Sequence, residues 1–202
     1  MKRVTSAALL FAALSAAASA HAQAPLARNQ TPEHVTVFAE VGGLFPVGRF
    51  GNVADAGFAP SVGGYYQVND FIAPAFRIGW AFLAPNRDVT GPGGSLDMLT
   101  ALLGLRFSLP VKSRVHPWAS ILGGIAHYAS YRALPLEPVM DPGSSSRTDP
   151  AFTFGGGLDV DLHPNFSLGF DVHALFSIST ESGGSERNLT AVSVGGMALL
   201  HY

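Results

Sequence analysis

The sequence predicts an all-β protein, an eight-stranded antiparallel, up-and-down transmembrane β-barrel preceded by a cleaved signal peptide. Three observations support this prediction. Eight segments have strand-like composition, and the connections between them alternate between short and long. Where the strand pattern is clear, apolar residues occupy one face and charged residues the other, with the period of two that a β-strand imposes.

The N-terminus has the order of a secretory signal peptide. Lys2 and Arg3 precede an apolar run over residues 4–18, and the small-residue stretch Ala20-His21-Ala22 follows. The run is too short and too rich in alanine for a convincing membrane anchor. The predicted division of the chain is a signal peptide over 1–22, a periplasmic lead-in over 23–33 and the barrel over 34–202.

Composition excludes several classes of protein. The chain has no cysteine, so it has neither a disulfide framework nor a thiolate metal site. Charged residues make up 13% of the chain, against about 25% in soluble domains, and the net charge of -2 does not suggest nucleic acid. No stretch after residue 22 approaches the ~18 consecutive apolar residues of a transmembrane helix, so strands would have to cross the membrane.

The strand-like segments are bounded by Gly, Pro, Asn, Asp or Ser. They cover residues 34–43, 57–68, 71–83, 95–109, 115–130, 151–162, 165–179 and 189–202. The connections at 68–71, 110–114 and 163–165 are short, whereas those at 44–56, 84–94, 131–150 and 180–188 are longer. Short turns at one end and long loops at the other are typical of bacterial outer-membrane barrels, with the turns in the periplasm.

Charged residues indicate which strand face meets lipid. In the segment 71–83, Ile72, Phe76 and Trp80 alternate with a face that carries Arg77. A cation on the lipid side costs about 2 to 4 kcal/mol at the membrane midplane, so the strand face that carries the charges must face the lumen. Asp97 is the exception and lies near a long loop. In segment 115–130, a bulge at Gly123-Gly124 could switch parity, which leaves the facing of His127 and Tyr128 open.

An eight-stranded barrel is just wide enough for side chains to fill its interior. Buried charges are tolerated when they are paired and hydrogen-bonded, so we expect a polar network that fills the lumen. The alternative is a narrow, gated ion path. The predicted lumen residues are Glu40, Arg77, Arg106, Asp159, Asp161, Asp171 and His173.

The mature chain resembles the small eight-stranded outer-membrane barrels of the OmpA-like and OmpX-like type. The resemblance rests on the signal peptide and on four further segments of the sequence. They are the pattern from Val41-Gly42-Gly43 to Pro46-Val47-Gly48, the sequence His116-Pro117-Trp118, the run Gly155-Gly156-Gly157-Leu158-Asp159 and the C-terminal strand. In such barrels the last strand carries the signal that the barrel-assembly machinery reads, here Leu200 and Tyr202, with Tyr202 in place of the more usual Phe.

The resemblance implies a cell-envelope protein, porin-like in architecture, in the outer membrane of a Gram-negative bacterium. Its expected partners are outer-membrane lipid, lipopolysaccharide, the assembly machinery and an extracellular partner bound by the loops, particularly 131–150. We expect a monomer without cofactor, metal or nucleic acid. Four aromatic residues near the short turns are candidates for the periplasmic aromatic girdle: Phe71, Trp118, Phe166 and Tyr202.

Two other functions compete with this interpretation. Some barrels of this kind modify lipid A, and the best candidate group here is His173 with Asp171, near Ser177 and Ser179. Residues two apart on a strand share a face, but their side chains do not readily meet, and the His-Ser-Asn motif of lipid A deacylases is absent; we expect no enzymatic activity. A secreted, lipocalin-like binder of small ligands would need an apolar interior, whereas the strand faces that carry the charges here are predicted to face inward.

Overall fold

The computed structural model describes residues 34–48, 50–52, 54–84, 96–130, 145–178 and 189–202. The predicted signal peptide and lead-in lie outside these residues, as do most of the long connections. Within the described ranges, no helix is long and apolar enough to cross a membrane.

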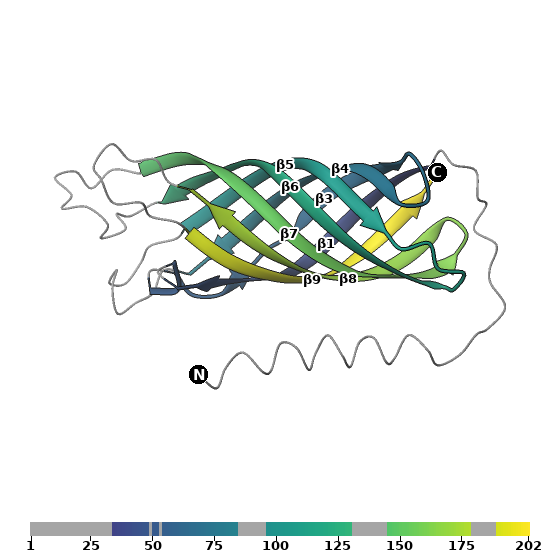
Figure 1. The fold of residues 1–202 in the computed structure, drawn as a ribbon. Helices are drawn as coiled ribbons and strands as arrows, with labels where there is room; N and C mark the ends of the chain where they lie inside the picture. The colour runs from purple at the N-terminus through teal and green to yellow at the C-terminus, as the bar shows by residue number, and fades with distance from the viewer. Residues whose placement is uncertain (1–33, 49, 53, 85–95, 131–144, 179–188) are drawn as a thin grey trace, which may run out of the picture.

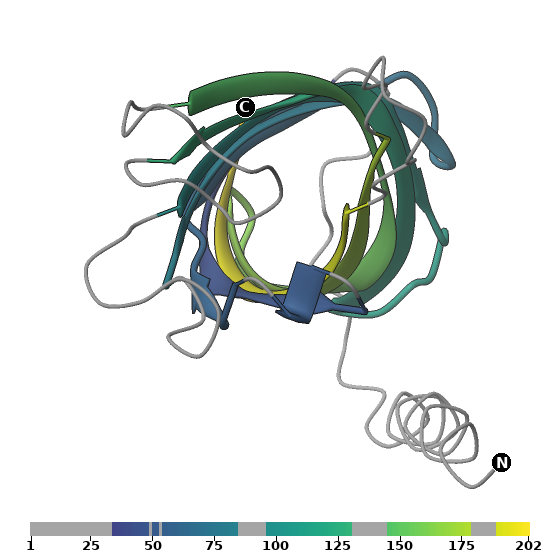
Figure 2. The ribbon, with the colours of Figure 1, turned by 90° about the vertical axis from the view of Figure 1, so that its left-hand side faces the viewer.

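The described residues form β-strands with one short 3-10 helix. The elements are β1 (His34–Val47), η1 (Phe50–Asn52), β2 (Gly57–Phe58), β3 (Ser61–Gln67), β4 (Ile72–Leu83), β5 (Leu96–Ser108), β6 (Val115–Ser130), β7 (Ser145–His163), β8 (Phe166–Ser177) and β9 (Leu189–His201). Neighbouring strands in the sheet pair antiparallel, and β1 also pairs with β9 from Thr36↔His201 to Val47↔Thr190. The sheet therefore closes into a ring (Figures 1 and 2).

The ring has eight positions because β2 and β3 share one of them. Phe58 pairs with Gly43 and Ser61 pairs with Glu40, so the register against β1 is continuous across the interruption. Ala59 and Pro60 lie in between, and proline lacks the N–H that a ladder needs. Backbone hydrogen bonds still join the neighbouring strands there, since Ala59 N donates to Gly42 O and Trp80 N donates to Pro60 O. The prediction of eight antiparallel strands is confirmed.

The two ends of the ring differ. We call the end that carries residues 68–71, 109–114 and 164–165 the turn end; both His34 and Tyr202 lie there (Figure 1, right). The opposite end, at which the longer connections leave the strands, is the loop end. By the rule that short turns face the periplasm, we expect the turn end to be the periplasmic end.

The predicted facing of the clear strands is confirmed. On β4, the exposed side chains alternate with buried or half-buried ones, Ala73 and Arg77 among them. The apolar side chains on the outside of this strand are Ile72, Phe76, Ile78, Trp80 and Phe82. Asp97 has the outward parity and is only the second residue of β5, at the loop end.

Two predicted boundaries are wrong, because pairing partners extend the strands. β1 continues to Val47 rather than ending at residue 43, since β9 pairs with it throughout. β7 begins at Ser145 rather than residue 151, although residues 145–150 are polar. The long strand β6 supplies their partners, and His127 Nδ1 lies 2.8 Å from Thr148 Oγ1 across the two strands. The loop predicted at 131–150 is shorter by these six residues.

The glycine pair Gly123-Gly124 does not bulge. β6 pairs residue for residue with β5 and with β7 on either side of it. Parity is therefore continuous, and Tyr128 points into the lumen, 6% exposed, whereas His127 lies on the outer face. The facing that the sequence left open is settled by the unbroken ladders.

The loop-end half of the lumen is packed with apolar side chains, which we call the apolar collar. Phe50 of η1 belongs to this group and is 2% exposed. The other buried members are Leu44, Ala54, Ala81, Leu83, Leu96, Met98, Leu102, Leu122, Ala126, Tyr128, Ala151, Leu175 and Ala191. The collar occupies the lumen between the charged residues described next and the loop end.

Candidate functional site

A charged bridge crosses the middle of the lumen. Arg77 on β4 reaches Glu40 on β1, with Nη2 2.5 Å from Oε1, and Asp171 on β8, with Nη1 3.2 Å from Oδ2. Ser61 on β3 donates a hydrogen bond of 2.7 Å to the second oxygen of Glu40. Both carboxylates are almost fully buried, so Arg77 compensates two charges that are out of contact with water.

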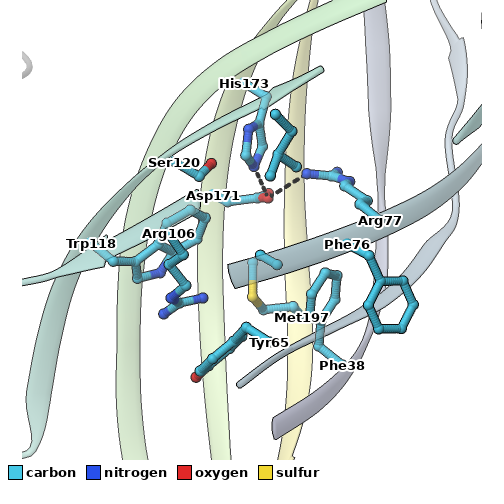
Figure 3. A pocket seen from close by; sticks show the side chains of 12 residues that line it. Phe38, Tyr65, Phe76, Arg77, Arg106, Trp118, Ser120, Asp171, His173 and Met197 are labelled. Atoms are coloured by element: carbon cyan, nitrogen blue, oxygen red, sulfur yellow. Dashed lines mark hydrogen bonds and ion pairs between the residues drawn. The ribbon is translucent and has the colours of Figure 1, made fainter. Parts of the chain in front are cut away.

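His173 extends this bridge. Its Nε2 lies 2.7 Å from Asp171 Oδ2, an ion-pair distance without hydrogen-bond geometry (Figure 3). The expectation that these two side chains do not meet is therefore wrong. They project from the same strand into a lumen narrow enough to turn them toward each other. The ring of His173 also lies beside Trp118, with centroids 5.8 Å apart.

A second charged pair lies closer to the turn end. Arg106 on β5 forms an ion pair with Asp159 on β7, and Trp118 donates a 2.9 Å hydrogen bond to the same carboxylate. The guanidinium lies 4.1 Å from the ring centre of Trp118 and 4.4 Å from that of Tyr65, which are cation–π distances. Trp118 is 7% exposed, so its predicted place in the periplasmic girdle is wrong.

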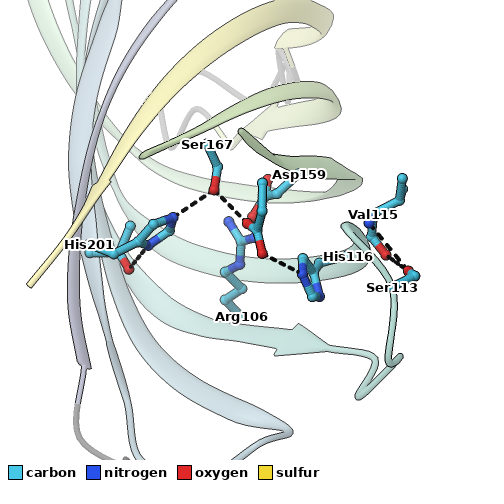
Figure 4. A network of polar contacts seen from close by, with 9 residues as sticks. Arg106, Ser113, Val115, His116, Asp159, Ser167 and His201 are labelled. Carbon is cyan, nitrogen blue, oxygen red and sulfur yellow. Dashed lines mark hydrogen bonds and ion pairs between the residues drawn. The ribbon is translucent and has the colours of Figure 1, made fainter. Parts of the chain in front are cut away.

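A chain of hydrogen bonds closes the lumen at the turn end (Figure 4). Ser167 Oγ donates to Asp161 Oδ1 at 2.6 Å and lies 2.8 Å from His201 Nε2. The chain continues at both ends, since His201 Nδ1 lies 2.9 Å from Thr36 Oγ1 and Asp161 Oδ2 lies 2.8 Å from His116 Nε2. Five strands, β1, β9, β8, β7 and β6, are thereby linked across their inner faces.

Glycines on neighbouring strands make room for the large lumen side chains. A Cβ on Gly195 would lie 2.5 Å from Glu40 Oε1, and a Cβ on Gly155 would lie 2.5 Å from His173 Nδ1. A Cβ on Gly157 would similarly lie 2.9 Å from the Trp118 ring. Each distance is too short for a real side chain. Gly155, Gly157 and Gly195 are therefore explained by close packing inside the lumen.

Little space remains between the bridge and the second pair. A cavity of about 30 Å³ lies there, enough for about two water molecules. Its lining includes Arg77, Arg106, Ser120, Asp171 and His173 (Figure 3). A space of this size is a packing defect in a filled interior rather than an aqueous channel.

The structure places all seven predicted lumen residues on the inner face but divides them into three groups. The bridge holds Glu40, Arg77, Asp171 and His173, the second pair holds Arg106 and Asp159, and the hydrogen-bonded chain holds Asp161. Sequence reasoning missed the neutral partners, which are Thr36, Ser61, His116, Trp118, Ser167 and His201. Each shares the inward parity of its strand, and that was the available signal.

The described residues offer no catalytic arrangement of the kind considered from sequence. Ser177 contacts Asp149, with a long hydrogen bond of 3.4 Å, and Ser179 lies outside the described residues. In the chain at the turn end, the serine hydroxyl separates the carboxylate from the histidine, whereas a triad places the histidine between them. Ser167 is also fully buried. Among described residues, no group of three His, Cys, Asp or Glu could hold a metal.

The sequence matches a known family over most of its length. The model of the outer membrane protein beta-barrel domain matches residues 6–196. The chain belongs to this family. It is therefore a protein of the bacterial outer membrane, and its apolar outer face meets lipid. No curated protein matches this outer-membrane barrel in sequence.

Solved structures show the same fold. Neisserial surface protein A aligns with a TM-score of 0.61 at 12% identity, covering 82% of this barrel and 96% of that chain. OprG from Pseudomonas aeruginosa aligns with a TM-score of 0.53 at 10% identity, covering 87% and 98%. Ail, the attachment invasion locus protein of Yersinia pestis, in complex with the heparin analogue sucrose octasulfate, aligns at 0.51 and 11% identity, covering 84% and 99%.

Proposed function

We propose that this outer-membrane barrel is a closed scaffold that holds its long connections at the cell surface for interaction with an extracellular partner. The observation that carries the proposal is the filled lumen. Apolar side chains occupy its loop-end half, and ion pairs and hydrogen bonds that involve β1 and every strand from β3 to β9 span the rest. A wall that is fixed from inside keeps the strand ends in place, and loops on a rigid scaffold commonly carry recognition.

The similar structures support a surface role. One is named a surface protein, and another is named for attachment and invasion and was solved with a heparin analogue. Their identity to this chain is low, so they support the architecture and suggest the class of activity without naming a ligand. The long connections of this chain would select their own partner.

The proposed role is non-enzymatic. A nucleophile must reach its substrate, and the buried Ser167 cannot do so without opening the chain at the turn end. The proposal also includes assembly as a monomer by the barrel-assembly machinery. Leu200 and Tyr202 fit this part, because Leu200 on β9 and Tyr202 directly after it are both exposed, at 45% and 71%.

Surface attachment can be tested with a variant that keeps the barrel. Residues 85–95, 131–144 and 179–188 are each replaced by an Asn-Gly turn, which favours a tight hairpin. Bacteria expressing the wild type should attach to cultured epithelial cells more than vector controls, and the variant should fall to the control level. SDS gels with and without boiling check that both barrels fold. Equal attachment by wild type and variant, or none above control by the wild type, contradicts the proposal.

A further inference from the structure

The apolar outer row of β5 continues beyond the end of the strand. Leu103, Leu105 and Phe107 face outward on the strand, and Leu109 and Val111 prolong the row into the 109–114 turn. These last two side chains are 52% and 39% exposed. Two large apolar side chains beyond a lipid-facing row indicate that the turn stays in contact with the membrane rather than leaving it for the periplasm.

The 109–114 turn has a fixed shape. Leu109 N donates to Pro117 O at 3.0 Å, and Asp161 N donates to Arg114 O at 2.8 Å, so both ends are tied to neighbouring strands. Between them, Ser113 Oγ donates to Val115 O at 2.7 Å (Figure 4). Side chains displayed by such a turn keep a constant place relative to the outer wall.

Two cations lie on this turn beside the apolar residues. Lys112 and Arg114 are exposed, and within the described part of the chain neither side chain forms an ion pair or hydrogen bond. Long basic side chains at the edge of an apolar band extend their charges to the level of the lipid headgroups. The acidic headgroups of an anionic leaflet attract such charges.

We propose that the 109–114 turn is a binding site for an anionic phospholipid of the periplasmic leaflet. Lys112 and Arg114 contact the headgroup phosphate, and Leu109 and Val111 contact the start of the acyl chains. The site combines a charge-dependent part with an apolar part, and an anionic lipid satisfies both. Lipopolysaccharide is not the ligand, because it occupies the other leaflet, at the loop end.

Native mass spectrometry of the refolded barrel in micelles with equal amounts of phosphatidylglycerol and phosphatidylcholine tests the site. The wild type should retain phosphatidylglycerol over phosphatidylcholine by about thirtyfold, as expected for two cations near a lipid surface at about 1 kcal/mol each. Lys112→Gln with Arg114→Gln should remove the preference. Asp70→Asn with His163→Gln, a double change at the other two short connections that removes neither Lys112 nor Arg114, should leave it. Gel mobility with and without boiling confirms that each variant is folded.

Three results would overturn the proposal. One is equal retention of both lipids by the wild type, and another is a preference unchanged by the substitutions at Lys112 and Arg114. The third is displacement of phosphatidylglycerol by millimolar inorganic phosphate, which would make the turn a free-phosphate site. Leu109→Ser with Val111→Ser supplies an independent check, since it should lower retention of both lipids alike.

Discussion

The two halves of the lumen are filled by different physical means. Toward the loop end, the apolar collar buries residues such as Phe50, Leu96 and Leu102. Toward the turn end, buried carboxylates are held by two arginines and by hydroxyl and imidazole groups. A packed apolar group tolerates loss of one member by leaving a cavity, whereas a charged network that loses one member leaves an uncompensated charge. The charged half should therefore be the more sensitive.

The largest expected effect is that of Arg77→Ala. It leaves Glu40 and Asp171 buried without their shared cation, and we expect a loss of about 3 to 5 kcal/mol in unfolding free energy. Urea titration in lipid vesicles, followed by gel mobility, measures it. The triple variant Glu40→Gln, Arg77→Met, Asp171→Asn removes all three charges together and should unfold close to the wild type. If the triple variant is the less stable, the bridge itself is the main source of stability.

The matching change in the apolar collar is Leu102→Ala. It removes a side chain that is 4% exposed inside the lumen and should cost about 3 kcal/mol, mainly through the cavity it leaves. Leu103→Ala, the next residue on the lipid face, is the control and should cost much less, because acyl chains fill the gap. Equal losses in the same urea titration would mean that the collar is not packed.

Packing around the bridge is tested by a pair of neighbouring glycines. Gly195→Ala places a methyl group against Glu40 Oε1 and should cost about 1 to 3 kcal/mol through overpacking. Gly196→Ala points outward, where the nearest atom would be 3.9 Å away, and should be close to neutral. The reverse order of the two stabilities would show that the facing of β9 is wrong.

The smallest effect is expected at the loop-end rim. Arg147 Nη2 lies 2.7 Å from Asp149 Oδ2; the arginine side chain is 28% exposed and the aspartate side chain 4%, so water screens the cation but not the carboxylate. Arg147→Gln keeps a hydrogen-bond donor for this carboxylate at the rim and should cost about 1 kcal/mol of unfolding free energy. A loss as large as that of Arg77→Ala would remove the distinction between rim and interior.

The barrel could be predicted from sequence to a large extent, because the period of two identifies both the strands and their lipid face. Residues 145–150 escaped prediction, since their polar composition says nothing of the long partner strand β6 that holds them. Trp118 was assigned to the girdle from its place near a turn, although it shares the parity of Ser120. The alternation of residues along each strand predicts that the charges face the lumen. Their division into three groups depends on the position of each residue along the barrel axis and on distances across the ring, which no local sequence pattern contains.

The conductance of the refolded barrel in a planar lipid bilayer tests the filled lumen most directly. We predict no stable open-channel current for the wild type, because the apolar collar and the charged bridge together occupy the lumen. Arg77→Ala should reduce the unfolding free energy more than it changes the conductance. A steady wild-type current, or an Arg77→Ala barrel that conducts with unchanged stability, would contradict the closed scaffold and establish the lumen as an ion path.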